Sequence, residues 1–245
     1  MKKVIAYVAS RNINSATLRN TKIILNQLES SFPSLFSIEV ITPHDLAVHP
    51  SNGCKTCYEE GYCPIDELGI DKGAEFKTKL LEADFIILSS PVYSHNVSAD
   101  MKAVIERLSY WGHIFKLAGK SGIVLATADS NGVHHVSDYL EKIAHIMGLN
   151  VIDKLNITTR APLKEHYLEE LVQEIYEYAY GLKEIEVDER AERSFQTYKK
   201  TYIQLPTTLA EPKYWKENGL FNHESLQSYI DEILVKQRDK DQKQI

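Results

Sequence analysis

The sequence predicts a doubly wound α/β fold, in which helices cover both faces of a five-stranded parallel sheet and a C-terminal helical extension follows. Short, continuous apolar runs over the first two-thirds of the chain are typical of strands buried on both faces. Between these runs, apolar residues recur at helical spacing. Strands separated by helices pair in parallel through right-handed crossovers, so the alternation predicts one layered α/β domain.

Five segments have the character of strands, at residues 4–8, 38–41, 85–88 and 123–126 and from residue 151 onward. In sheets of this kind, ligands bind at the carboxyl ends of the strands, near the point where the strand order reverses. We therefore expect a site in the loops that follow Val8, Leu88 and Ala126.

The segments between the strands have helical spacing. Ser15 can cap a helix whose apolar face contains Leu18, Thr21, Ile24, Leu25 and Leu28. Further apolar helix faces lie within residues 76–81, 101–108 and 133–147. Each of these helices connects two successive strands, as a parallel sheet requires.

Residues 1–160 are expected to form the sheet domain, and residues 161–245 the helical extension. The extension has a tyrosine-rich amphipathic helix over residues 168–182 and a charged helix over residues 184–202. A short helix is expected between Pro212 and Gly219, another around residues 226–233, and a charged, frayed tail over residues 236–245. The extension is expected to cover a substrate pocket or to contact a second subunit.

Composition restricts the partners. The net charge of −6 gives no reason to expect a nucleic-acid partner. No apolar run approaches the ~20 residues that span a bilayer, so no membrane partner is expected. The chain has three cysteines and no visible export signal, which favours a cytoplasmic location with free or metal-bound thiols.

The loop after the first strand is rich in hydroxyl side chains and precedes a helix. Backbone N–H groups and the helix dipole at such a place favour a phosphate dianion. The alternative is an ordinary helix cap on an ordinary loop. The candidate phosphate-binding residues are Ser10, Arg11, Asn14, Ser15, Ala16 and Thr17.

The other two loops offer a flat surface and small polar groups. Pro91 stiffens the second loop, Tyr93 can stack on a ring, and Asn96 can bond to ring heteroatoms; otherwise Tyr93 packs and Ser98 caps a helix. The third loop would let backbone approach a ligand edge. The candidate residues here are Pro91, Val92, Tyr93, Ser94, His95, Asn96, Thr127, Asp129 and Gly132.

Together the three loops resemble those of the flavodoxin-like NAD(P)H-dependent FMN reductases, and most closely the branch that includes the iron–sulfur flavoproteins. The resemblance covers roughly residues 3–157. It is carried by the serine- and threonine-rich first loop, by the Ser-Pro-Val-Tyr turn at residues 90–93, by Val-Ser-Ala at residues 97–99 and by Glu106-Arg107. The first loop departs from the family pattern, because Ala9 replaces a usual glycine and Arg11 is shifted by one position.

The resemblance implies FMN as cofactor, with its phosphate at residues 10–17, its ring against residues 91–96 and the polar edge of the ring near residues 127–132. NADH or NADPH would donate electrons, and a quinone, nitro compound, free flavin or other small molecule would accept them. No catalytic side chain is assigned; Tyr93 and His95 are candidates for proton delivery or substrate contact. Family members usually dimerise, and Tyr110, Trp111 and His113 are expected at that contact.

All three cysteines lie within ten residues of the chain. In the iron–sulfur flavoproteins the corresponding loop carries four cysteines spaced C-x2-C-x2-C-x5-C, which here become Ser51, Cys54, Cys57 and Cys63. Three alternatives remain: a cluster completed by a residue such as His49, a zinc site, or no metal, with thiols near the flavin. The last is favoured. An electron-transfer or thiol redox-sensing flavoprotein without its own substrate is the alternative function.

Overall fold

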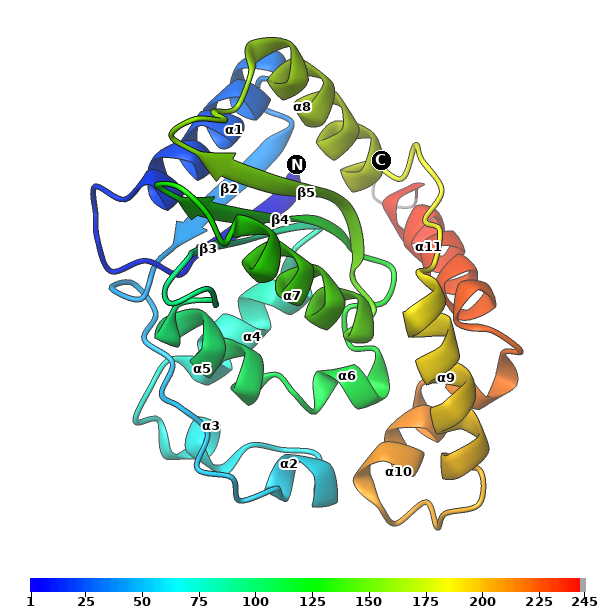
Figure 1. The fold of residues 1–245 in the computed structure, drawn as a ribbon. Helices are drawn as coiled ribbons and strands as arrows, with labels where there is room; N and C mark the ends of the chain where they lie inside the picture. Colours follow the sequence, from blue (N-terminus) through cyan, green and yellow to red (C-terminus); the bar gives the residue numbers. More distant parts are fainter. Residues whose placement is uncertain (243–245) are drawn as a thin grey trace.

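A computed structural model describes residues 1–242 and contains one sheet of five parallel strands (Figure 1). The strands are β1 (Lys2–Val8), β2 (Phe36–Ile41), β3 (Phe85–Pro91), β4 (Ser121–Ala128) and β5 (Asn150–Thr158). Their order across the sheet is β2-β1-β3-β4-β5. The order reverses beside β1, which places the expected ligand crevice at the carboxyl ends of β1 and β3. The predicted flavodoxin-like fold is confirmed.

One face of the sheet is covered by α1 (Ala16–Ser31) and α8 (Glu165–Ala179), which lie side by side (Figure 1). Ile24 and Leu28 of α1 share a hydrophobic core with Leu171 and Ile175 of α8. Helix α8 covers the sheet although it lies after residue 160, where the sheet domain was expected to end.

The opposite face is covered by α4 (Gly73–Glu82), α5 (Ala99–Arg107) and α7 (Val133–Ile146), with the short α6 (Trp111–Ile114) beside them. Ile5 and Tyr7 of β1 face this layer, whereas Val4 and Ala6 face the α1 layer. The alternation follows from the two-residue period of a strand, and it explains why the strands are continuous apolar runs.

The rest of the extension comprises α9 (Glu189–Tyr202), α10 (Ala210–Glu217), a 3-10 turn η1 (Leu220–Asn222) and α11 (Leu226–Gln242). The fully buried Trp215 anchors it, with its ring centroid 4.9 Å from that of Phe195 and 6.1 Å from that of Phe115. The expected helix over residues 184–202 begins five residues late, because the Asp188 carboxylate accepts the Arg190 N–H at 2.8 Å and caps α9.

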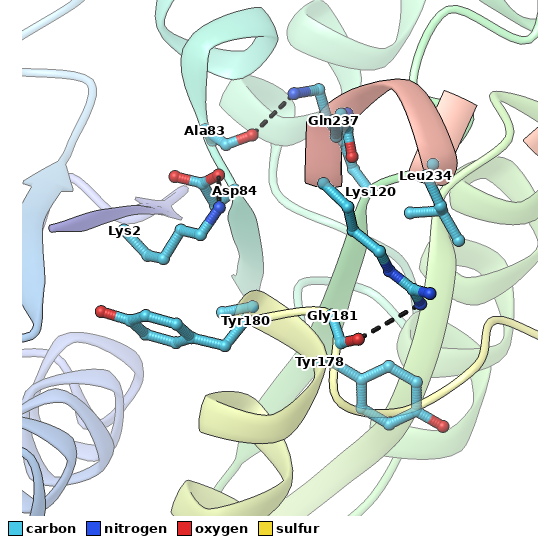
Figure 2. A pocket seen from close by; sticks show the side chains of 12 residues that line it. Lys2, Ala83, Asp84, Lys120, Tyr178, Tyr180, Gly181, Leu234 and Gln237 are labelled. Atoms are coloured by element: carbon cyan, nitrogen blue, oxygen red, sulfur yellow. Dashed lines mark hydrogen bonds and ion pairs between the residues drawn. The ribbon is translucent and has the colours of Figure 1, made fainter. Parts of the chain in front are cut away.

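Helices α9, α10 and α11 lie toward the amino ends of the strands, away from the arrowheads (Figure 1). There the end of α8 and one face of α11 meet the starts of β1 and β4 (Figure 2). The Lys120 ammonium donates to the Ala83 carbonyl at 2.6 Å (Figure 2) and to the Leu81 carbonyl at 2.8 Å. Arg238 of α11 donates to the Gly181 carbonyl at 3.3 Å. The tail expected to fray from residue 236 continues α11 to residue 242, and residues 243–245 lie outside the described part.

Two short helices, α2 (Thr56–Glu59) and α3 (Pro64–Leu68), lie in the cysteine segment between β2 and α4. Helix α2 contacts α10 of the extension. Across residues 1–242, every helix is too short or too polar to cross a bilayer.

Candidate functional site

The three predicted loops meet at the carboxyl edge of the sheet. The Thr17 and Thr127 hydroxyls are buried and hydrogen-bonded to each other at 2.7 Å, which joins the first loop to the third. The Val92 N–H donates to the Thr127 carbonyl at 2.9 Å, which joins the second loop to the third. Residues separated by up to 110 positions in the sequence are thus held in one constellation.

The first loop ends in unused backbone donors. Ser15 caps α1 by accepting the Leu18 N–H at 3.1 Å. The N–H groups of Ala16 and Thr17, in the first turn, have no acceptor among residues 1–242. Because α1 has 16 residues, its positive end adds to these donors, and the arrangement fits a phosphate group. The Thr17 hydroxyl is already paired, so its backbone N–H is the group left for a ligand.

Ser10 and Asn14 shape the same loop. Ser10 is 4% exposed, and its hydroxyl accepts the Asn12 N–H at 3.3 Å. The Asn14 N–H donates to the Asn12 side chain at 2.9 Å, and the Asn14 carbonyl accepts from Arg19. Both residues hold the loop in a tight turn that leads into α1.

Arg11 is held by an acid that the sequence did not identify. Its guanidinium donates to both carboxylate oxygens of Asp100, at 3.0 and 2.8 Å. This hydrogen bonding raises the pKa of Arg11. The His44 ring lies 2.7 Å from the Arg11 carbonyl. Asp100 stands in the first turn of α5, where an acid is common, but its pairing with a residue 89 positions away leaves no local signal.

The second loop is a two-residue turn between Tyr93 and Asn96, whose backbones exchange two hydrogen bonds of 2.9 Å. Ser94 and His95 both have positive φ, of 49° and 58°, as such a turn requires. Tyr93 is 54% exposed, so its ring is available to stack on a flat ligand. The Asn96 side-chain oxygen accepts the Val97 N–H at 2.8 Å, which leaves its amide donors available.

Ser98 braces the first two loops against each other. Its hydroxyl donates to the Ala9 carbonyl at 2.7 Å and accepts the Met101 N–H at 3.2 Å. Its own N–H donates to the Ser90 hydroxyl at 3.0 Å. A helix cap at Ser98 was the alternative interpretation of this residue, and Ser98 does cap α5. Its contact with Ala9 also joins segments 89 residues apart.

Gly132 closes the third loop against the second. Its φ is 85°, and a Cβ there would lie 2.9 Å from Val92 Cγ1 and 3.3 Å from His95 Nδ1. Only glycine permits both the backbone conformation and the close approach. Asp129 is exposed, and its carbonyl accepts the Thr159 hydroxyl at 2.6 Å.

The cysteine segment lies elsewhere. Cys57 and Cys63 line a cavity with Arg107, Tyr110 and Tyr214, and no residue of the three loops lines it. Arg107, at the end of α5, holds this segment by ion pairs to two carboxylates, Asp66 and Asp71. Ser98 and Arg107 stand at opposite ends of α5, about 13 Å apart by helical rise, so the cysteine segment and the second loop are attached to opposite ends of this helix.

The three thiols are free, with Cys54 exposed and the other two half-buried. Within residues 1–242, no three His, Cys, Asp or Glu side chains come together as a metal site would need. His49, the suggested fourth ligand, donates its backbone N–H to Asp71 at 2.7 Å.

The residues expected at a subunit contact are instead covered by the extension of the same chain. Tyr110 and Trp111 are 7% and 6% exposed. The His113 ring pairs with the Glu211 carboxylate at 2.9 Å, and the Trp215 indole donates to the His113 carbonyl at 3.0 Å. A long extension therefore occupies the surface that a second subunit was expected to cover.

Comparisons with known proteins agree with this geometry. The family model described as NADPH-dependent FMN reductase matches residues 2–161. An iron–sulfur flavoprotein of Archaeoglobus fulgidus is 28% identical over 205 residues, which are 80% of this chain and 89% of that protein. One of Methanocaldococcus jannaschii is 42% identical over 95 residues, covering 38% of this chain and 47% of its own. An FMN-dependent NADH:quinone oxidoreductase of Pseudomonas putida is 24% identical over 167 residues, which cover 59% of this chain and 81% of that protein.

Solved structures support the fold. An apo NADH:FMN oxidoreductase superposes with a TM-score of 0.52 at 19% identity, covering 78% of this chain and 94% of that one. The RosB structure superposes with a TM-score of 0.57 at 14% identity, covering 74% and 80%. At these identities the likeness concerns the arrangement of strands and helices.

Proposed function

The chain belongs to the NADPH-dependent FMN reductase family, and we propose that it uses FMN to pass electrons from NADH or NADPH to a small acceptor, with a quinone as the first choice. The main support for this proposal comes from the loops at the carboxyl ends of the strands. The Thr17–Thr127 hydrogen bond holds the first and third loops together, and two backbone N–H groups at the start of α1 have no acceptor there. The quinone is chosen because of the Pseudomonas relative.

In this proposal the N–H groups of Ala16 and Thr17, with Ser10, hold the phosphate. Tyr93 and Asn96 contact the ring, and the loop from Thr127 to Gly132 borders its polar edge. Bound there, FMN would supply the hydride-accepting and electron-donating chemistry of the reaction. The protein binds and orients the ring and excludes water from its inner face, and no side chain needs to be titrated.

The proposal is tested with protein purified without added flavin. We expect a two-band flavin spectrum that NADH or NADPH bleaches without air and that a benzoquinone restores. A colourless protein that does not bind FMN at micromolar concentrations contradicts the assignment. Comparing initial rates with the two nucleotides identifies the donor.

The names of two relatives raise the question of a cluster, and the residues present do not fit one. Four thiolates normally hold such a cluster. This chain supplies three, with Ser51 at the first position. We propose that FMN is the redox group, and iron analysis of the purified protein should find far less than one iron per chain.

We further propose a cytoplasmic homodimer in which the second subunit covers the carboxyl edge. Two large apolar side chains are exposed there, Ile13 at 72% and Tyr93 at 54%. The three free thiols suit a reducing compartment. Light scattering should give twice the monomer mass, and Ile13→Asp should lower it; an unchanged dimer in that variant places the interface elsewhere.

A further inference from the structure

A second cavity, of about 250 Å³, lies between the cysteine segment, the end of α5 with α6, and α10. Cys57 and Cys63 both line it. The extension forms its roof, since a Cβ on Gly61 would lie 3.6 Å from Ala210 Cβ of α10. The cavity shares no residue with the three loops at the carboxyl edge. It is therefore a separate place for chemistry.

The cavity contains a buried donor with no partner. The Arg107 side chain is 2% exposed; Nη1 donates to Asp71 at 2.5 Å and to the His49 carbonyl at 3.2 Å, and Nη2 donates to Asp66. The Nε–H has no acceptor among residues 1–242. An unpaired buried donor costs about 1–3 kcal/mol, so an acceptor placed beside this group would stabilise the site.

Two sulfur atoms line the same cavity as Arg107. Cys63 is close enough to Arg107 for the two groups to interact electrostatically. Cys57 interacts in the same way with Cys63 and with Lys77. Two thiols and a poorly satisfied guanidinium thus share one cavity.

Lys116 adds a positive charge to the lining of the cavity. Its ammonium lies 3.5 Å from the Tyr214 hydroxyl and 4.7 Å from the Tyr214 ring centroid. No ion pair joins it to a carboxylate in the described part of the chain. Two carboxylates also line the cavity: Asp66, which pairs with Arg107 and Lys77, and Glu67. Burial lowers the pKa of Lys116, so a ligand carboxylate would gain from meeting this cation away from bulk water.

We propose that this cavity is a thiol–disulfide exchange site for a small disulfide that carries a carboxylate. The Cys63 thiolate attacks one ligand sulfur, forming a mixed disulfide and releasing the other half as a thiolate. Cys57 then loses its proton to that thiolate and attacks Cys63 Sγ, which releases the second half. The two cysteines are oxidised to one disulfide and the ligand is reduced to two thiols. The first half takes the Cys57 proton, and the second half leaves as a thiolate and takes from solvent the proton that Cys63 released when it ionised.

The test uses the protein with its bound cofactor, without NADH or NADPH, in a Cys54→Ser background that removes the exposed thiol. The probes are 3,3′-dithiodipropionate, which is anionic, and cystamine, which is cationic. We expect loss of two hydrogens by mass spectrometry, at least about tenfold faster with the anionic probe after correction for the reactivity of each probe toward a free thiol. Lys116→Met should bring the corrected rates together, whereas the exposed Lys213→Met on α10 should not.

The two cysteines have different expected products. Cys57→Ser should stop at a mixed disulfide on Cys63, with the mass of one half of the probe added. Cys63→Ser should form neither product at the wild-type rate. Circular dichroism and the flavin spectrum check that each variant is folded. Equal corrected rates with both probes in the parent, or oxidation of Cys63→Ser as fast as the parent, would overturn the proposal.

Discussion

The two edges of the sheet contain different types of residue. At the carboxyl edge, small and hydroxyl residues are joined by buried hydrogen bonds, and backbone donors of α1 are left unused. At the amino edge, aromatic side chains and α11 close the sheet. A parallel sheet directs its strand ends and helix N-termini to one edge, so ligand binding is concentrated there. The other edge is free to supply stability.

The largest expected effect tests the stabilising role of the extension. Trp215→Ala removes a fully buried indole and should lower the free energy of unfolding by about 3–5 kcal/mol, measured by urea denaturation. The FMN affinity of the molecules that remain folded should not change. Leu182→Ala, at a 64% exposed position, is the control and should change little. If Trp215→Ala weakens FMN binding without lowering stability, the amino edge does not have a purely stabilising role.

The next effect tests the joined loops. Thr17→Val leaves the buried Thr127 hydroxyl unpaired and should cost about 1–3 kcal/mol of stability. The double variant Thr17→Val with Thr127→Val removes both partners, so much of the stability should return. FMN affinity, measured by fluorescence titration, should stay about tenfold weaker in the double variant, equivalent to about 1.4 kcal/mol. Thr21→Val, one turn further along α1, is the matched buried-hydroxyl control; an equal loss there would contradict the assignment.

A smaller effect is expected at the exposed pair of the same edge. Arg11→Gln breaks an ion pair with Asp100 whose net value at the surface is under about 1 kcal/mol. FMN affinity should fall less than in the Thr17 variant. Asp100→Asn frees the guanidinium to face the phosphate and should tighten binding slightly at low salt. Weaker binding in Asp100→Asn would mean that the pair itself, and not a free arginine, shapes the loop.

The smallest effect concerns pH at the extension. Burial lowers the pKa of His145, which lies 3.6 Å from Asp188 at the start of α9. Below its ordinary pKa near 6.5, the unfolded chain then binds a proton that the folded protein does not. Stability should therefore fall as the pH drops through and below 6.5, and be fully present above it. His145→Gln should flatten this slope in thermal melts, whereas the exposed His134→Gln should keep it.

Much of the fold could be predicted from local pattern. The five strands and the four long helices that connect them were recovered because buried parallel strands are continuous apolar runs and their helices repeat every 3.6 residues. The short helices α2, α3 and α6 were not predicted. The ends were less accurate: β2 begins two residues earlier than expected, and α9 begins at residue 189. The Asp188 side chain caps α9 and so fixes its first residue, and the spacing of apolar residues does not reveal such a cap.

The loops of the site could be predicted as segments but not as contacts. The Ser-Pro-Val-Tyr turn and the capped start of α1 are local features. The partner of Arg11 lies 89 residues away, and the partner of the Thr17 hydroxyl 110 residues away. No local sequence pattern predicts either pairing.

By itself, the sequence determined the layered α/β architecture, the family and the edge of the sheet where a flavin is expected, because each follows from residues close together in the chain. The tertiary structure decided that the extension closes the amino edge, that Arg107 draws the cysteines to the far end of α5, and that α10 encloses them in a cavity. These results depend on which distant side chains can be buried and paired together, and that is settled only when the whole chain packs.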